Sequence, residues 1–277
     1  MRPILRCGRF ELPLDRPLVM GIVNVTPDSF YDGGRYRDAR AAIEHARQLK
    51  EEGADILDVG GESSRPGAEP ISTGEELRRV LPVREGITDL NAPVSIDTTK
   101  PEVMRAAIAR GAAMINDITA LREPGSLEAV AESDAAVCLM HMQGEPRTMQ
   151  ANPEYGDVVG EVRDYLGARA EACIGAGMAR ERIVVDPGFG FGKKTAHNLA
   201  LLVHLDALAA LGYPVLVGLS RKSSLGRLTG RPAEERLAGS IAAALLAVER
   251  GARIVRVHDV AATRDALAVL AAVENAQ

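Results

Sequence analysis

The chain has 277 residues, 46% of them hydrophobic, with a formal net charge of −5 at pH 7. A chain of this length and content can bury a large core, and we expect one domain over residues 1–277. The acidic balance, the absence of Trp and the 3% aromatic content argue against nucleic-acid binding, which normally needs a basic surface and stacking side chains.

Three cysteines, Cys7, Cys138 and Cys173, lie far apart in the sequence. Their odd number and irregular spacing match neither a disulfide framework nor a zinc site, so we expect a reducing compartment, the cytoplasm. The longest uninterrupted apolar stretch, Ile241–Val248, is too short to span a bilayer. The segment Pro17–Val23 follows two charged residues without a cleavage site, and we interpret it as a first buried strand rather than a signal peptide.

Short apolar segments alternate with helical patterns along most of the chain. After Thr73 the apolar residues recur at helical spacing, and the interval from Thr73 to Glu76 predicts a capping box. Pro101 suits a first helical turn, and Gly53, Gly111 and Gly251 suit left-handed helix ends before the next strand. The predicted strands are Pro17–Val25, Ala54–Val59, Ala92–Asp97, Ala112–Asn116, Ala135–His141, Arg182–Asp186, Tyr213–Leu219 and Ala252–His258.

Eight strands joined by helices predict a parallel sheet closed into a (β/α)₈ TIM barrel. An open doubly wound sheet is the main rival, because it uses the same units. The barrel fits better, since most strands end in an isolated polar residue and barrels build their chemistry at the carboxyl ends of the strands. The segments Val25–Arg37 and Gly60–Thr73 are long enough to be mobile lids or surface loops.

Arg256 and His258 are two residues apart on the last strand, so they face the same side. A buried arginine needs an anionic partner, which could be a phosphate group, Asp259 or another acid. We favour phosphate, because the planar guanidinium fork suits that geometry.

Asp97 and Asp186 end the third and sixth strands. The two carboxylates could be a general acid and base, metal ligands, or acceptors for a ligand rich in N–H donors. Asn116 fits the second or third of these roles, and Asp117 is expected to face away.

The glycine-rich stretch Asp186–Lys193 has neither the Walker A spacing nor that of a dinucleotide-binding loop. It could follow a flat ligand with Phe189 or Phe191 against it, or it could be a tight turn with one Phe in the core. After the seventh strand, Ser220–Ser223 places two cations at the barrel mouth. Such short runs are commonly solvated surface, but directly after an apolar strand at least one of the cations should face the pocket. Three further histidines, His45, His197 and His204, have no metal-ligand spacing.

Seven motifs together resemble the dihydropteroate synthase family of folate biosynthesis, in the same order and over nearly the whole chain. They are Gly21–Phe30, Gly60–Gly67, Ser95–Thr98, Met140–Gly144, Asp186–Lys193, Gly218–Lys222 and Arg256–Asp259. The resemblance implies a TIM barrel that joins 6-hydroxymethyl-7,8-dihydropterin pyrophosphate to 4-aminobenzoate and releases pyrophosphate. It also implies a homodimer, two loops that close over the substrates, and a target for sulfonamides.

The resemblance assigns roles to individual positions. Catalytic roles fall on Asp97, Lys222, Arg256 and His258, and Asn24 would ligate Mg²⁺ on the pyrophosphate. The pterin would be held by Asp97, Asn116, Asp186, Lys222 and Met140, the pyrophosphate by Ser64, Arg256 and His258, and the aminobenzoate by Arg65, Pro66, Phe191 and Ser220, with Gly218 also at the binding site. Ser64 replaces the usual Thr, and Tyr31 replaces a smaller residue.

Two other functions are compatible with many of these residues. A pterin-binding methyltransferase shares the barrel and the pterin carboxylates, but it would not require Ser220–Lys222 or Arg256 and His258. A catalytically silent paralogue that binds only pterin would not need Asn24, Arg65, Lys222 and Arg256.

Overall fold

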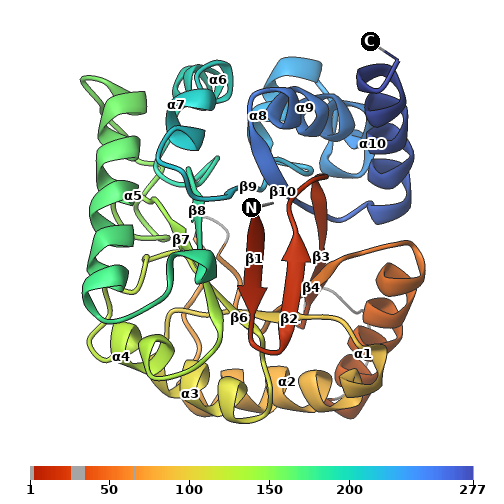
Figure 1. The fold of residues 1–277 in the computed structure, drawn as a ribbon, viewed down its shortest axis with the longest axis vertical. Coiled ribbons are helices and arrows are strands. Elements are labelled where there is room, and N and C mark those ends of the chain that lie inside the picture. Colours follow the sequence, from red (N-terminus) through yellow and green to blue (C-terminus); the bar gives the residue numbers. More distant parts are fainter. Residues whose placement is uncertain (1–2, 26–34, 65–66, 277) are drawn as a thin grey trace.

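A computed structural model describes residues 3–25, 35–64 and 67–276 of the chain. Parallel strands form a closed barrel in the order β10-β3-β4-β5-β6-β7-β8-β9, with helices around it (Figure 1). The predicted TIM barrel is therefore confirmed and the open sheet is excluded. The strands are β3 (Leu18–Asn24), β4 (Ile56–Gly60), β5 (Val94–Asp97), β6 (Met114–Asp117), β7 (Ala136–Met140), β8 (Ile183–Asp186), β9 (Val215–Val217) and β10 (Ala252–Val257).

Helices follow the barrel strands and cover the outer face of the barrel. They are α1 (Arg35–Glu51), α2 (Thr73–Gly86), α3 (Pro101–Ala109), α4 (Ser126–Ala131), α5 (Val158–Gly175), α6 (Thr195–Val203), α7 (Asp206–Ala209), α8 (Ser223–Thr229), α9 (Leu237–Glu249) and α10 (Val260–Glu274), with 3₁₀ turns at Thr88–Leu90, Arg180–Arg182 and Ala233–Glu235. Within the described ranges, none of the helices combines the length and the apolar character needed to cross a membrane.

The predicted helix ends are mostly confirmed. Pro101 is the first residue of α3, and Gly53, Gly111 and Gly251 have φ values of 99°, 83° and 101°, in the left-handed region. The capping box predicted at Thr73 was wrong by one residue.

At the start of α2 the capping residue is Ser72, whose hydroxyl accepts a hydrogen bond from the Glu75 N–H at 3.2 Å. Glu76 is buried instead and pairs with Lys100 at 2.6 Å. Tertiary burial of Glu76 therefore decides which of two neighbouring hydroxyl residues caps the helix.

Side chains that face the inside of the barrel change from apolar to polar along four of the strands. Ile56, Met114, Val184 and Ile254 belong to one inner core cluster. The residues two positions further along the same strands share their face, because strand side chains alternate with a period of two. These residues are Asp58, Asn116, Asp186 and Arg256, so the barrel interior becomes polar toward its carboxyl end.

A hairpin that the sequence patterns did not indicate lies at the amino end of the barrel. It consists of β1 (Ile4–Cys7) and β2 (Phe10–Pro13), paired antiparallel, and it lies in front of the barrel in Figure 1. Leu5, Cys7 and Leu14 pack against the inner core cluster. The hairpin therefore covers the end of the barrel opposite to the polar one.

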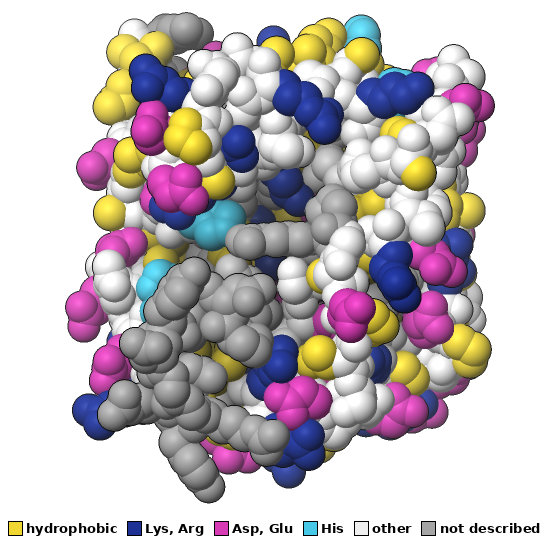
Figure 2. Space-filling model, turned by 180° about the vertical axis from the view of Figure 1, so that it is seen from behind, with side chains coloured by type: hydrophobic (Ala, Val, Ile, Leu, Met, Phe, Trp, Pro, Cys, Tyr) yellow, Lys and Arg dark blue, Asp and Glu magenta, His cyan; other side chains and the backbone are white. Residues whose placement is uncertain are grey.

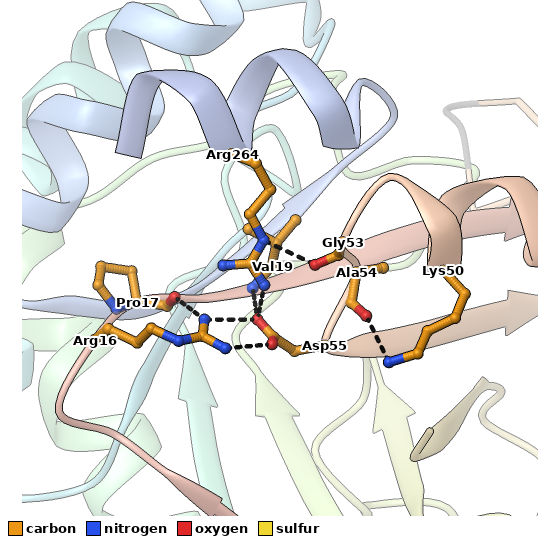
Figure 3. Close-up of polar contacts among 8 residues, drawn as sticks. All are labelled: Arg16, Pro17, Val19, Lys50, Gly53, Ala54, Asp55 and Arg264. Carbon is orange, nitrogen blue, oxygen red and sulfur yellow. Dashed lines mark hydrogen bonds and ion pairs between the residues drawn. The ribbon is translucent and has the colours of Figure 1, made fainter. Parts of the chain in front are cut away.

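Close to the hairpin end, Asp55 joins the first two barrel strands to the last helix (Figure 3). Its carboxylate accepts hydrogen bonds from Arg16 at 2.7 and 3.1 Å and from the Val19 N–H at 2.8 Å. Arg264 of α10 also donates to Asp55, and to the Gly53 carbonyl at 2.7 Å. These bonds hold the closing helix α10 against β3 and β4.

Candidate active site

The carboxyl end of the barrel holds a pocket lined by residues from most of the strand ends. Figure 2 shows this face, turned away from the hairpin, with a hollow near its centre and basic side chains and a histidine around it. Nine of the predicted site residues line the pocket: Ser64, Asp97, Asn116, Met140, Asp186, Phe191, Gly218, Lys222 and Arg256. Ile118, Gly188 and Phe189 complete its walls.

Arg256 lies between two carboxylates from other strands. Its Nε is 2.6 Å from Asp58 Oδ2, and its Nη2 is 2.9 Å from Asp97 Oδ2. Burial opposes the charge on Arg256, but Asp58 and Asp97 outweigh this effect and raise its pKa above the usual value. The arginine is thus neutralised by protein carboxylates without the phosphate group that the sequence favoured. Asp259, the other partner considered, pairs with Arg221 at 2.5 Å instead.

Asp58 is the site residue that sequence reasoning missed. It is fully buried, its Oδ2 accepts a hydrogen bond from the Asn116 amide at 3.2 Å, and its Oδ1 has no hydrogen-bond partner in the described part of the chain. The sequence did contain one indication of its role: Asp58 is an acidic residue at an inward position of the apolar segment Ala54–Val59, where a buried charge requires a partner.

Asp186 is a buried carboxylate and Asp97 a half-buried one, and the proton affinity of both is raised. Burial raises the pKa of Asp186 to about 6, although the Gly188 N–H, which donates to its Oδ1 at 2.7 Å, and Lys222 act in the opposite direction. Burial also raises the pKa of Asp97, while Arg256 opposes the rise. Asp117 turns away as expected, because its carboxylate accepts from the N–H groups of Thr119 and Leu121.

The glycine-rich loop after β8 is organised around Lys193, a residue that the sequence did not single out. Its Nζ is buried and donates to three carbonyl oxygens, those of His141 at 3.2 Å, Gly188 at 3.1 Å and Phe191 at 3.0 Å. It also lies 2.9 Å from His141 Nδ1. Burial lowers the pKa of Lys193 to about 7 and that of His141 to about 3, so His141 is neutral.

The loop lies so close to the segment after β7 that two of its positions require glycine. A Cβ at Gly188 would lie 2.0 Å from the His141 oxygen, and one at Gly192 would lie 2.3 Å from the Gln143 oxygen. The ring of Phe191 lines the pocket, with Lys222 Nζ 4.3 Å from its centroid, and Phe189 is almost fully buried beside it. One aromatic ring thus faces the ligand space and the other belongs mainly to the core.

His258 and Ser220 form a hydrogen-bonded pair at the same barrel end, although neither is among the residues that line the pocket. Ser220 Oγ accepts from the His258 backbone N–H at 3.2 Å and lies 3.0 Å from His258 Nδ1. Burial and the charges of Arg221 and Arg256 lower the pKa of His258 to about 4. A neutral ring whose Nδ1 accepts the Ser220 hydroxyl proton carries its own proton on Nε2.

Asn24 ends β3 beside Gly60, half-buried at the carboxyl end of the barrel. The described residues contain no group of three or more His, Cys, Asp or Glu that could hold a metal by themselves. A single amide oxygen still suits Mg²⁺, which often keeps water and phosphate oxygens and takes few protein ligands. Three positions named in the sequence analysis lie outside the described residues: the predicted site residues Arg65 and Pro66, and Tyr31.

Comparisons with known proteins agree with this geometry. The sequence model of the pterin binding enzyme family matches residues 20–258. The dihydropteroate synthase of Neisseria meningitidis serogroup B is 54% identical over 275 residues, which cover 97% of this chain and 96% of that protein.

Two solved structures of dihydropteroate synthases have nearly the same fold. The enzyme of Xanthomonas albilineans with 4-aminobenzoic acid has a TM-score of 0.94 and 57% identity, covering 99% of both chains. The enzyme of Burkholderia cenocepacia with 7,8-dihydropteroate has a TM-score of 0.90 and 54% identity, covering 99% of this chain and 98% of that one. The chain therefore belongs to the pterin binding enzyme family and, within it, to the dihydropteroate synthases.

Proposed function

We propose that this chain joins 6-hydroxymethyl-7,8-dihydropterin pyrophosphate to 4-aminobenzoate, forming 7,8-dihydropteroate and releasing pyrophosphate. The observation that carries the proposal is the shared pocket of Asp97, Asn116, Asp186, Lys222 and Arg256. Such a pocket offers acceptors for a heterocycle and cations for a phosphorylated leaving group. The relatives crystallised with 7,8-dihydropteroate and with 4-aminobenzoic acid support the same pair of ligands.

The pterin is recognised by the buried carboxylates. A pterin edge presents an amino group beside a ring N–H, and an ionised Asp186 can accept two parallel hydrogen bonds from them. Asn116 and Asp97 add polar contacts, Lys222 approaches the carbonyl side, and Met140 packs against the ring. Because Asp186 is buried, each of these hydrogen bonds is made away from competing water.

The pyrophosphate lies toward Arg256, His258 and Ser64. Cleavage of the carbon–oxygen bond adds negative charge to the pyrophosphate, which a fixed guanidinium and the Nε2–H of a neutral His258 stabilise. Asn24 would hold Mg²⁺ on the pyrophosphate, where the ion supplies further charge neutralisation. Arg256 is held in place by Asp58 and Asp97, so little reorganisation is needed when the charge develops.

The substitution is dissociative. Loss of pyrophosphate leaves positive charge on the pterin methylene carbon, and the carboxylate of Asp97 stabilises it. The amine of 4-aminobenzoate is already nucleophilic, so it attacks this carbon without a strong base and then loses a proton. Phe191, Ser220 and Gly218 border the aminobenzoate side, where sulfonamides would compete, and the family resemblance assigns Arg65 and Pro66 to the same substrate. The resemblance also implies that two long loops close over the substrates, which would exclude water as a rival nucleophile.

We also propose that the chain forms a homodimer in the cytoplasm. Exposed apolar side chains on neighbouring helices support the dimer, since such patches mark interaction surfaces. These side chains lie on α6, α8, α9 and α10, which follow one another around the barrel in Figure 1. They are Leu199, Val203, Leu228, Leu237, Leu246, Val269 and Val273. All three cysteines are free and buried, which supports a reducing compartment.

A product assay tests the proposed reaction. The purified chain is incubated with the pterin pyrophosphate and Mg²⁺, with and without 4-aminobenzoate, and dihydropteroate and pyrophosphate are both measured. Equal amounts of the two products, formed over many turnovers, are expected only when both substrates are present. Pterin binding without any product would indicate a silent paralogue, and methyl transfer to a corrinoid protein without pyrophosphate release would indicate a methyltransferase; either result would overturn the proposal.

A further inference from the structure

A second cavity, of about 320 Å³, lies at the amino end of the barrel, opposite to the active site. Its walls come from the turn of the β1–β2 hairpin, from the ends of α2 and α3, and from the segments that lead into β5, β6 and β7. Figure 1 shows the hairpin and these helices on the face turned toward the viewer. A volume of this size accommodates a small organic molecule.

The buried guanidinium of Arg84 lines this cavity without an acidic partner. Arg84 is 8% exposed, and no carboxylate of the described residues lies within ion-pair distance of it. Its Nη1 donates to Thr88 Oγ1 at 3.0 Å and its Nη2 to the Gly111 carbonyl at 2.6 Å, whereas its Nε has no hydrogen-bond partner there. Burial and the charge of Arg9 lower the pKa of Arg84, although the charge of Glu85, which pairs with Arg110, acts in the opposite direction. A buried cation that no acid contacts directly is unfavourable, and an anion in the cavity would relieve this.

The rest of the lining suits a ligand with a flat apolar body. Arg9 is the second cation of the wall and lies over the Phe10 ring, 4.9 Å from its centroid, while Asp134 is the one acid among the lining residues. Ile87 and Ile108 supply aliphatic surface, together with small alanines. The cavity therefore combines a cationic corner with apolar walls.

We propose that this cavity binds a small aromatic carboxylate, with its carboxylate at Arg84 and its ring among Phe10, Ile87 and Ile108. An arginine fork pairs well with a carboxylate, and the aromatic ring replaces water along the apolar walls. The ligand would also contact Ala92 and Ala113, which precede the strands that carry Asp97 and Asn116. This binding is independent of the reaction proposed above.

Fluorine NMR with 4-fluorobenzoate as the probe tests the proposal on the full chain, with 7,8-dihydropteroate saturating the active site so that the probe cannot bind in the proposed aminobenzoate pocket. The wild type should show a saturable shift, and Arg84→Met should weaken the apparent affinity at least about tenfold through loss of the charged partner. Arg105→Met removes an exposed arginine of α3 that does not line the cavity and should leave the affinity unchanged. Uncharged fluorobenzene should bind at least about tenfold more weakly than the carboxylate.

A second variant guards against misfolding of Arg84→Met. Ile108→Trp keeps the arginine but fills the cavity, and it should abolish the saturable shift while thermal denaturation reports a folded protein. Absence of saturable binding to the wild type would overturn the proposal. So would binding that persists in both Arg84→Met and Ile108→Trp, or binding that is lost in Lys222→Met instead, because it would then belong to the barrel mouth.

Discussion

Arg256 of β10 and Asp97 of β5 meet across the barrel mouth, with 2.9 Å between Nη2 and Oδ2. In the proposed mechanism this contact would hold the guanidinium, which stabilises the leaving group, beside the carboxylate that stabilises the developing cation. Arg256→Gln should lower the rate of pyrophosphate release in single turnovers by about an order of magnitude or more. Arg256→Lys, which keeps the charge but not the fork, should lose less. An unchanged rate in Arg256→Gln would remove this residue from the mechanism.

Ser220 lies 3.0 Å from His258 Nδ1, and we expect its hydroxyl to fix which ring nitrogen carries the proton. Ser220→Ala should reduce kcat about tenfold and leave pterin affinity nearly unchanged, because the imidazole loses its preferred tautomer but not its place. Ser220→Thr retains a hydroxyl and should recover most of the rate. Steady-state kinetics across pH would check this prediction, and equal losses in the Ala and Thr variants would contradict it.

Pterin affinity should depend on pH through Asp186. Its pKa is raised to about 6, and only the ionised carboxylate can accept two hydrogen bonds. Affinity should therefore be full above this pH and fall by up to about tenfold per pH unit below it. Calorimetric titrations from about pH 7.5 to about pH 5 would measure the effect. Asp186→Asn should bind weakly with a flatter profile, and a flat profile in the wild type would contradict the assignment.

Lys193 should be needed for the shape of the loop rather than for surface charge. Lys193→Met removes the donor to three buried carbonyl oxygens and the contact with His141, and should reduce the free energy of unfolding by about 2–4 kcal/mol. It should also weaken pterin binding, because the loop contains Phe191 and supports Asp186. Lys194→Met alters an exposed neighbour and serves as the control in denaturant unfolding. Similar stabilities of the two variants would show that the buried contacts contribute little.

Asp55 should make the fold sensitive to acid. Burial raises the pKa of Asp55, but the bonds from Arg16 and Val19 and the charge of Arg264 outweigh burial and set it below its ordinary value. A lowered folded-state pKa gives stability that is present above the unfolded pKa of about 3.9 and lost as the pH falls through the folded value.

Asp55→Asn should therefore lower the free energy of unfolding near neutral pH by about 2 kcal/mol, since Arg264 keeps a partly buried charge without its partner. The difference from the wild type should shrink in acid below the folded pKa of Asp55. Thermal unfolding at several pH values measures this, and a difference that stays constant into acid would contradict the role of the ionised carboxylate.

Local patterns were sufficient to predict the barrel. Each strand segment is apolar, and glycines such as Gly53 and Gly251 end the preceding helices. The sequence therefore shows both the alternation of strands with helices and the places where the helices end. The hairpin at Ile4–Pro13 was not predicted, because strands of four residues are too short to show a clear alternation of apolar and polar residues. Ser72 replaced Thr73 as the cap because long-range burial of Glu76 set the start of α2.

The candidate site was predictable where polar residues interrupt the ends of strands, as Asp97, Asn116 and Asp186 do. Asp58 and Lys193 could not be predicted as site residues, because the residues that they contact are distant in sequence. Asp58 and Arg256 are 198 residues apart and are brought together by closure of the barrel, whereas Lys193 and His141 are 52 apart and are brought together by the pairing of β7 with β8. Pairwise neutralisation of buried charge is a property of the fold and cannot be read from one segment.

A single-turnover comparison of the wild type with Asp186→Asn tests most directly whether one cavity holds the pterin and drives its cleavage. With both substrates present, the wild type should form dihydropteroate and pyrophosphate in equal amounts, and the variant should be slower by about a hundredfold or more at any attainable pterin concentration. Equal rates in the two proteins, or pyrophosphate released without dihydropteroate, would contradict the convergence of these residues on one reaction.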